Sequence, residues 1–293
     1  MRRTALVTGH KGFIGRQVIA ALDKAGYGTV GIDIADGTDA RWFFQHDTSC
    51  FDLVIHTAAV VGGRRVVAGS PLDHAQNLEI DAALFAWARR TQPGRVIYYS
   101  SSCAYPARLG KTGRDLQEDD ITWPPKPGMM PDELYGWTKL TGEFLAGTAR
   151  DDGLSVSVVR PFSVYGPGMN DGFAVKGFAA QIRKRADPLE IWGDAGQVRD
   201  FIHVKDVCAA VLEMAEQRID GPVNLGTGRG TSLRELAVMM AAAAGYAPGI
   251  TVNTTLPAGV PRLVANPARL LRFHAPAVSL ETYFAAAMRQ KQT

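Results

Sequence analysis

The sequence predicts an α/β protein with a doubly wound parallel sheet and a smaller α/β domain towards its C-terminal end. In the first half of the chain, short runs rich in β-branched and aromatic residues alternate with helical patterns, which is typical of a parallel sheet covered by helices. A glycine-rich segment between the first strand and the first helix has the form of a nucleotide-binding turn. A chain of 293 residues can fold as one large domain or as a large and a small one.

Five strands are expected in the first half, each a short apolar run. They cover residues 4–8, 29–33, 53–56, 95–101 and 155–160. After the first strand, "IGRQVIAALDKAG" sets Ile14, Val18 and Leu22 at helical spacing, and "LEIDAALFAWARR" gives a second apolar helix face around Leu84. This alternation predicts a Rossmann-like sheet.

The pattern changes after Pro161, where "YGPGMNDG" predicts a loop. Helices are expected at 174–186, 232–244 and 279–290, with short strands or loops at "LEIWG", "VRDFIHV" and "PVNLGTG". We therefore expect a first domain over 1–165, to which the chain returns around 200–228. The smaller, substrate-binding domain is expected over 166–199 and 229–293.

Composition excludes several classes of function. The chain has 32 Lys and Arg against 29 Asp and Glu, with the basic residues scattered, so we expect no nucleic-acid partner. No apolar run approaches the length of a membrane span, so no membrane is expected either. Three cysteines, Cys50, Cys103 and Cys208, are too few and too unevenly spaced for a disulfide framework or a zinc site. We expect a cytoplasmic protein without a metal.

The segment "VTGHKGFIG" carries the most specific local signal near the N-terminus. Gly9, Gly12 and Gly15 follow a predicted strand and open a predicted helix, so the chain can turn tightly and aim helix N–H groups at a pyrophosphate. The spacing is one residue longer than the G-x-G-x-x-G fingerprint. The segment indicates dinucleotide binding, with a plain strand-to-helix turn as the alternative.

Two aspartates extend this interpretation. Asp33 ends the second strand, where a carboxylate can accept hydrogen bonds from ribose hydroxyls and repels a 2′-phosphate, which favours NAD over NADP. Asp47, just before the third strand, is a candidate for the adenine amino group, although an exposed loop aspartate fits equally well.

Tyr135 and Lys139 lie four residues apart in "LYGWTKL", so on a helix their side chains share one face. An ammonium beside a phenol stabilises the phenolate and is expected to lower the pKa of Tyr135 from about 10 towards neutrality. The tyrosine could then act as a general base.

Taken together, "TGHKGFIG", "YSSSCAYP", "YGWTK" and "RPFSVYGPG" resemble the extended short-chain dehydrogenase/reductase family, the sugar-nucleotide epimerases and dehydratases. The likeness runs from residue 4 to about residue 240. It implies bound NAD and catalytic roles for Ser101, Tyr135 and Lys139, with Lys139 also holding the cofactor. It further implies cofactor contacts at Phe13, Ile14 and Ala58.

A further part of the resemblance concerns Cys103. The 4,6-dehydratases of this family carry Asp-Glu after their catalytic threonine, whereas this chain has Ser102 and Cys103 there, which disfavours elimination of water. "SSCAYP" is similar to the motif of the GDP-L-fucose synthases and GDP-mannose 3,5-epimerases, in which the cysteine works in epimerisation. "VKGFAAQIRK" is similar to the epimerase helix with the partner lysine, which implies that role for Lys176. The alternative is that Cys103 is a small, inert core residue.

Substrate contacts are also implied by the resemblance. "AAVVGGRR" resembles the Gly-Gly segment beside the sugar, which implies Gly62, Gly63 and Arg64. Arg199 matches an arginine that contacts the nucleotide diphosphate, a role that suits its forked guanidinium. Ser163 stands where many relatives have asparagine, so its contact with the substrate is expected to differ.

For Arg199, an ion pair with Asp200 or Asp194 is the alternative to a ligand contact.

These observations predict an NAD-dependent nucleotide-sugar epimerase, acting on a GDP- or UDP-hexose through a transient 4-keto intermediate and inverting C3 and/or C5 with Cys103 and Lys176. The alternatives are a 4-epimerase, with Cys103 as a core filler, and a 4-keto-6-deoxy sugar epimerase/reductase. A dinucleotide sensor without chemistry is disfavoured by the presence of Ser101, Tyr135 and Lys139. By family analogy we expect a homodimer formed through helices of the first domain.

Overall fold

The main sheet of the computed structural model confirms the predicted doubly wound α/β class. The structure describes residues 2–62, 71–123, 125–131, 133–255 and 258–289. Six parallel strands of the described residues form this sheet, in the order β2 (Gly28–Ile32), β1 (Thr4–Thr8), β3 (Leu53–His56), β4 (Val96–Tyr99), β5 (Val156–Pro161) and β9 (Gly221–Leu225). The order reverses between β1 and β3, and ligands bind at such a switch point, beyond the carboxyl ends of the strands.

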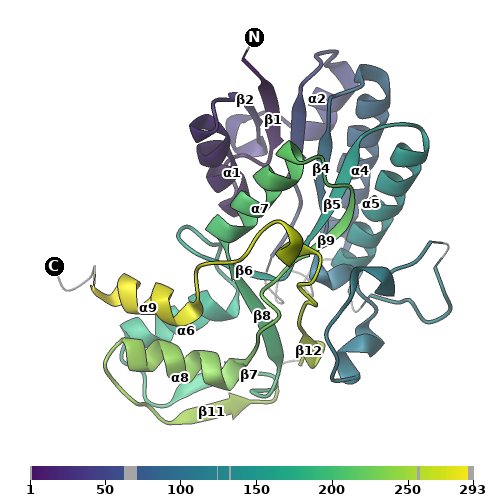
Figure 1. Ribbon diagram of the computed structural model, residues 1–293. Coiled ribbons are helices and arrows are strands. Elements are labelled where there is room, and N and C mark those ends of the chain that lie inside the picture. Colours follow the sequence, from purple (N-terminus) through teal and green to yellow (C-terminus); the bar gives the residue numbers. More distant parts are fainter. Residues whose placement is uncertain (1, 63–70, 124, 132, 256–257, 290–293) are drawn as a thin grey trace.

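Both faces of the main sheet are covered by helices, which explains why its strands are almost continuously apolar. Successive side chains of a strand point to opposite faces, so Ala5 and Val7 enter one core while Leu6 enters the other. The first core is closed by α1 (Phe13–Lys24) and α7 (Val204–Glu216), and the second by α2 (Ala40–His46), α4 (Pro71–Thr91) and α5 (Leu134–Asp151). Figure 1 shows these two layers on either side of the strands.

Local sequence explains where several elements begin and end. Proline at the first position of α4 costs no helical hydrogen bond, because that N–H has no partner inside a helix. Ser101 ends the fourth strand early, since its side chain accepts from the backbone of Cys103 and caps the short helix η2 (Ser102–Ala104). The observed strand is therefore β4, Val96–Tyr99, within the 95–101 expected from sequence.

A second region surrounds the far end of the chain. Its strands are β6 (Ser163–Tyr165), β8 (Val198–His203), β10 (Gly230–Ser232) and β12 (Arg262–Leu263), together with a separate pair, β7 (Leu189–Trp192) and β11 (Ile250–Asn253). Its helices α6 (Ala174–Arg183), α8 (Leu233–Ala243) and α9 (Leu280–Arg289) share a core that includes Phe178, Leu189, Leu236 and Phe284. Ser232 and Glu235 form a capping box that starts α8.

Between its two passages through the second region, the chain contributes α7 and β9 to the main sheet and its cover (Figure 1). The division into 1–165, 166–199 and 229–293 stays a prediction. Among the described residues, no helix combines the length and apolar character needed to cross a membrane.

Candidate active site

The glycine loop between β1 and α1 forms a cradle that side chains would fill. Gly9 has a positive φ of 70°, which glycine adopts without strain, and a Cβ there would lie 2.8 Å from the backbone of Ala58. A Cβ on Gly15 would lie 2.1 Å from the carbonyl oxygen of Gly9. Gly12 caps α1 without a side-chain hydrogen bond, so the first N–H groups of the helix remain available to a phosphate.

The surroundings of this loop also suit a dinucleotide. A hollow at the loop is lined by His10, Lys11, Arg16 and Ile19, and three of these side chains carry positive charge or gain it on protonation. Asp33 directly follows β2 and accepts hydrogen bonds from the backbone N–H groups of Lys11 and Ala35, both at 2.9 Å, which fixes its carboxylate beside the loop. The described residues therefore fit the pyrophosphate and ribose of NAD.

Three further predicted cofactor residues are partly buried: Phe13, Ile14 and Ala58. Phe13 and Ile14 pack against the core under α1, and Ala58 lies against Gly9. Asp47 ends α2 and accepts from Trp87 Nε1 at 3.1 Å and from Ser49 Oγ at 2.9 Å, so its carboxylate holds α4 and the following turn. Its contact with adenine stays a prediction.

Ser101, Tyr135 and Cys103 come together where β4 ends and α5 begins. Helix α5 approaches η2 closely because Gly136 has no side chain: a Cβ there would lie 2.2 Å from the carbonyl oxygen of Cys103. This approach allows the hydrogen bond between the Tyr135 phenol and Ser101. Cys103 is exposed, so it is not the buried core residue considered from sequence.

Burial raises the pKa of the Tyr135 phenol above its usual range. Cys103, when ionised, and Asp81 raise it further, while the hydrogen bond with Ser101 lowers it. The expected lowering by Lys139 is therefore wrong for the chain alone. The physical reason is the position of Lys139. Its ammonium points from α5 to the Tyr98 ring, 5.0 Å from the ring centroid, and not to the Tyr135 phenol.

Lys139 is almost fully buried, with an exposed fraction of 2%. Burial lowers the pKa of its ammonium, and the negative charges of Asp81 and Glu143 oppose that effect. Asp81 comes from α4 and Glu143 lies one turn further along α5. The carboxylates of Asp81 and Glu143 therefore favour the charged form of Lys139.

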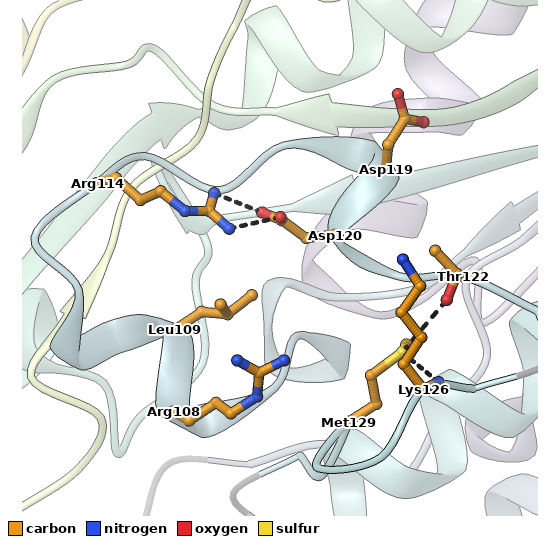
Figure 2. Close-up of a pocket in the computed structure, with 8 residues that line it drawn as sticks. All are labelled: Arg108, Leu109, Arg114, Asp119, Asp120, Thr122, Lys126 and Met129. Carbon is orange, nitrogen blue, oxygen red and sulfur yellow. Dashed lines mark hydrogen bonds and ion pairs between the residues drawn. The ribbon is translucent and has the colours of Figure 1, made fainter.

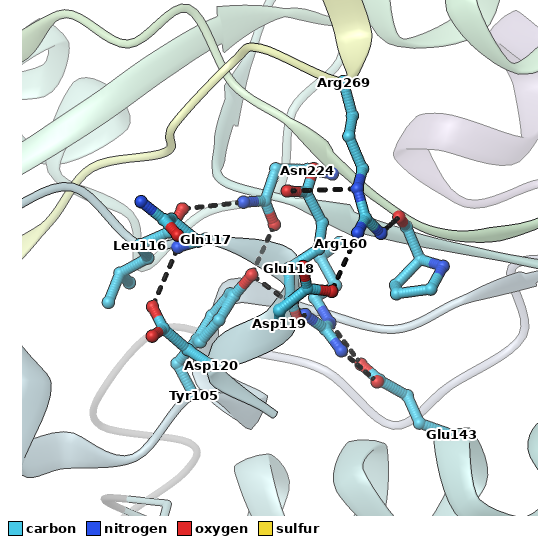
Figure 3. Close-up of polar contacts among 11 residues, drawn as sticks. Tyr105, Leu116, Gln117, Glu118, Asp119, Asp120, Glu143, Arg160, Asn224 and Arg269 are labelled. Atoms are coloured by element: carbon cyan, nitrogen blue, oxygen red, sulfur yellow. Dashed lines mark hydrogen bonds and ion pairs between the residues drawn. The ribbon is translucent and has the colours of Figure 1, made fainter. Parts of the chain in front are cut away.

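Glu143 also forms a buried ion pair that ties α5 to β5. Its carboxylate receives both Nε and Nη2 of Arg160, at 2.9 and 2.7 Å, and the hydroxyl of Ser100 at 2.5 Å. Arg160 in turn donates to the phenol oxygen of Tyr105 and to the carbonyl of Glu118 (Figure 3). This network connects the helix of Tyr135 with the segment that follows η2.

The predicted partner of Cys103 lies in the second region. Lys176 is in the first turn of α6, and its ammonium lies 3.4 Å from Asp171 Oδ1. Its side chain is 36% exposed.

The predicted substrate residues are spread over three segments. Gly62 is described, whereas Gly63 and Arg64 lie outside the described residues. Ser163 is half-buried in β6, which pairs with β8. Arg199 in β8 donates to Val198 O and to Gln197 Oε1, both at 2.9 Å.

Asp200, considered above as an ion partner of Arg199, has another structural role. It is buried and accepts from Thr227 Oγ1, at 2.7 Å, and from the backbone of Thr227, Gly228 and Ala265. It therefore holds the loop after β9.

A second hollow contains none of the predicted site residues. Figure 2 shows it between η3 (Ala107–Lys111) and the segment before α5, with Arg114 forked onto Asp120 at 2.6 and 2.8 Å. The sulfur of Met129 accepts from the backbone of Lys126 at 3.2 Å. These contacts hold together the segment that joins η2 to α5.

Sequence reasoning missed the supporting residues His56, Asp81, Tyr98, Glu143 and Arg160. A signal was present for Asp81, which precedes Leu84 by three residues and so lies on the apolar face of its helix. A carboxylate in that position indicates a buried partner.

A family model described as the NAD dependent epimerase/dehydratase family matches residues 5–226. The chain belongs to this family. It is therefore an NAD-dependent enzyme of the epimerase/dehydratase type, as the glycine loop and the Ser101, Tyr135 and Lys139 arrangement indicated. NAD as cofactor is confirmed.

Curated relatives span three activities. The chain is 30% identical to a dTDP-4-dehydro-6-deoxy-D-allose reductase of Streptomyces sp, over 92% of this chain and 89% of the relative. It is 26% identical to the GDP-L-fucose synthase of Escherichia coli K12, with 92% and 90% covered. It is 29% identical to GDP-mannose 3,5-epimerase 1 of Oryza sativa subsp. indica, with 79% and 66% covered.

Among solved structures, the chain resembles MoeE5 in complex with UDP-glucuronic acid and NAD. The two share 27% sequence identity and a TM-score of 0.81, with 99% of this chain and 100% of the other covered.

Proposed function

We propose that the protein is an NAD-dependent nucleotide-sugar epimerase that oxidises C4 of the sugar transiently and inverts C3 and/or C5. The observation that carries this proposal is the exposed Cys103 on η2, which packs against α5 at Gly136, the residue next to Tyr135. A thiol beside the proton-transfer tyrosine is suited to move a second proton at a neighbouring carbon.

Oxidation at C4 uses the residues at the end of β4. Once ionised to the phenolate, Tyr135 removes the proton of the C4 hydroxyl, and Ser101 hydrogen-bonds the same oxygen as it becomes a ketone. Lys139 contributes positive charge from beneath the tyrosine. When bound, NAD supplies the two-electron acceptor for this oxidation and returns the electrons at the end of the cycle.

Inversion follows from the acidity of hydrogens next to a ketone. With Cys103 on one face of the sugar and Lys176 on the other, one group removes the proton at C3 or C5 and the other returns a proton from the opposite face. The exposure of both side chains supports this division of roles. Gly62, Gly63, Arg64, Ser163 and Arg199 are proposed to hold the nucleotide and the sugar.

Proton NMR in deuterium oxide tests the proposal, with the purified enzyme, NAD and a panel of GDP- and UDP-hexoses. The expected result is deuterium at C3 or C5 of the sugar with the wild type. Cys103→Ala is expected to lose this exchange at least about 100-fold while still reducing NAD, because the oxidation does not need the thiol. Cys50→Ala is the matched control, since Cys50 is also exposed but lies before β3, away from Tyr135.

Interconversion at C4 without solvent deuterium contradicts this proposal and favours the 4-epimerase. A second candidate is a 4-keto-6-deoxy sugar reductase, favoured by the 30% identity to such a reductase. That activity predicts stoichiometric consumption of a reduced nicotinamide nucleotide instead of exchange.

A homodimer is proposed as well, through α4 and α5. Trp137 and Phe144 on α5 are 39% and 47% exposed, and Leu78 on α4 is 37% exposed. The Trp123 ring lies against Phe144 with ring centroids 4.8 Å apart and planes tilted by 43°, which widens this apolar surface. Exposed apolar patches of this kind mark protein interfaces. Sedimentation equilibrium is expected to give twice the chain mass, and a monomer at micromolar concentration contradicts the proposal.

A further inference from the structure

A chain of buried polar side chains lies beneath Lys139. Thr8 Oγ1 is 2.8 Å from His56 Nδ1, and His56 Nε2 is 3.2 Å from Asp81 Oδ1. The hydroxyl of Tyr98 donates to Asp81 Oδ2 at 2.6 Å. These residues lie at the ends of β1 and β3, in β4 and in α4, and each is at most 1% exposed. This row of hydrogen-bonded side chains therefore extends from the glycine loop to the interior beneath α5.

The protonation states along this chain follow from its surroundings. Burial lowers the pKa of His56 despite the neighbouring Asp81, so the imidazole is neutral. Burial raises the pKa of Tyr98, so its phenol keeps the proton that it donates. Burial alone would raise the pKa of Asp81, but the cationic Lys139 and the hydrogen bonds from His56 and Tyr98 lower it overall. Asp81 is thus a buried anion.

Helix α5 packs closely against the Asp81 carboxylate. A Cβ on Gly142 would lie 1.9 Å from the hydroxyl oxygen of Tyr98 and 2.7 Å from Asp81 Oδ2, so only glycine permits the approach. Lys139 precedes Gly142 by three residues and shares its helix face. Its ammonium lies over the Tyr98 ring, 5.0 Å from the centroid, in a cation–π contact.

Two carboxylates face Lys139, and Asp81 is the stronger counter-charge. The titratable groups around the ammonium are His56, Asp81, Tyr98, Tyr135 and Glu143. The two tyrosines and the histidine are neutral. Glu143 acts less strongly on Lys139 than Asp81 does, and it also pairs with the forked guanidinium of Arg160. Asp81 has hydrogen bonds from neutral groups alone among the described residues, so its charge is available to Lys139.

Asp81 acts on Lys139 through space, because each of its carboxylate oxygens already receives a hydrogen bond. Oδ1 faces His56 and Oδ2 receives Tyr98, which fixes the carboxylate. Lys139 Nζ makes no hydrogen bond with the described residues, so the ammonium can donate to a ligand or to reacting groups above it.

We propose that Asp81 is a positioning residue that keeps Lys139 charged and held over Tyr98 beneath the Tyr135 site. The inference rests on the proposed roles of Tyr135 and Lys139 in proton transfer. It extends the catalytic unit from three residues on η2 and α5 to a carboxylate on α4.

Asp81→Asn removes the charge and keeps the shape. Its amide oxygen can still accept from Tyr98, and its NH2 can donate to His56 Nε2 once the neutral imidazole carries its proton on Nδ1 and donates to Thr8. The expected result is a pKa of Lys139 lower by about one unit or more than in the wild type. It is measured by NMR titration of carbon-13 labelled lysine, with the signal assigned by Lys139→Met. The alkaline fall of kcat/KM is expected to begin at correspondingly lower pH.

Tyr98→Phe is the matched control, because it removes a hydrogen bond from Asp81 but leaves the carboxylate charge and the ring under Lys139. The pKa of Lys139 in this variant is expected to stay close to that of the wild type. In Asp81→Glu, which keeps the negative charge, the pKa of Lys139 is expected to return most of the way to the wild-type value. Asp81→Ser removes the same charge with a smaller side chain and is expected to reproduce the Asp81→Asn result. The test therefore does not depend on one variant folding.

An unchanged Lys139 titration in Asp81→Asn overturns the inference, and so does an equal shift in Tyr98→Phe, which would indicate a structural effect only. Failure of the proposed roles of Tyr135 and Lys139 has a different signature. In that case Tyr135→Phe and Lys139→Met would keep turnover, whatever the titration of Lys139 in the Asp81 variants.

Discussion

Tyr135→Phe is expected to lower kcat by about 10²–10⁴-fold, the usual contribution of a positioned general acid–base group. The phenyl ring keeps its edge contact with His74, whose ring centroid lies 5.7 Å away, so the fold around α5 should persist. Only the hydroxyl that bonds Ser101 is lost. Turnover of the nucleotide hexose is measured beside calorimetric titration with NAD, whose affinity should change little.

Tyr165→Phe provides the comparison for this loss. Tyr165 is equally a part of a buried aromatic group, but its hydroxyl donates to Val278 O at 3.0 Å in the second region. Its removal should leave kcat within a small factor of the wild type. Equal losses in the two variants, or undiminished turnover in Tyr135→Phe, would contradict the role given to Tyr135.

Glu143→Gln is expected to lower the free energy of unfolding by about 3–5 kcal/mol, the usual cost of breaking a buried ion pair from one side. Arg160 is 1% exposed, and its guanidinium receives compensating negative charge from Glu143 at 2.7 and 2.9 Å (Figure 3). Without it, the buried cation keeps, among the described residues, only the neutral partners Tyr105 and a backbone carbonyl. Urea unfolding at neutral pH measures the loss.

Two comparisons identify the cause of this instability. Glu281→Gln breaks the exposed pair of Glu281 with Arg229, which should cost no more than about 1 kcal/mol because water solvates both charges. Combining Glu143→Gln with Arg160→Met should cost less than the sum of the two single changes, since neither charge is then left alone. A strictly additive double variant would show that the pair is not the source.

The first half of the chain could be predicted well because its signals are local. The strands at 4–8 and 53–56 were predicted with the observed bounds, and Gly9, Gly12 and Gly15 lie at the turn that the sequence implied. A parallel strand buried on both faces reads as one apolar run, and a helix over it keeps a regular spacing. The Ser101 and Tyr135 contact likewise followed from motifs that are each a few residues long.

Other features depend on residues far apart in the sequence. Asp81, Tyr98 and Lys139 meet only because Gly142 allows α5 to approach β4, and the expected effect of Lys139 on the pKa of Tyr135 was wrong because the lysine lies over Tyr98. Helix α7 was not expected. Its N-cap is His203, whose Nδ1 accepts from the backbone of Lys205 at 3.2 Å, so the usual Ser, Thr, Asp or Asn signal is missing.

The central claim is a redox-neutral cycle in which the sugar is oxidised and then reduced again within one turnover. The most direct measurement mixes NAD-loaded enzyme rapidly with its nucleotide hexose, without added reductant. The near-ultraviolet absorbance of reduced NAD is monitored during the reaction. The account predicts a transient rise that decays as the epimer accumulates. Product formation that requires added reduced nucleotide, consumed mole for mole, would contradict it and make the protein a reductase.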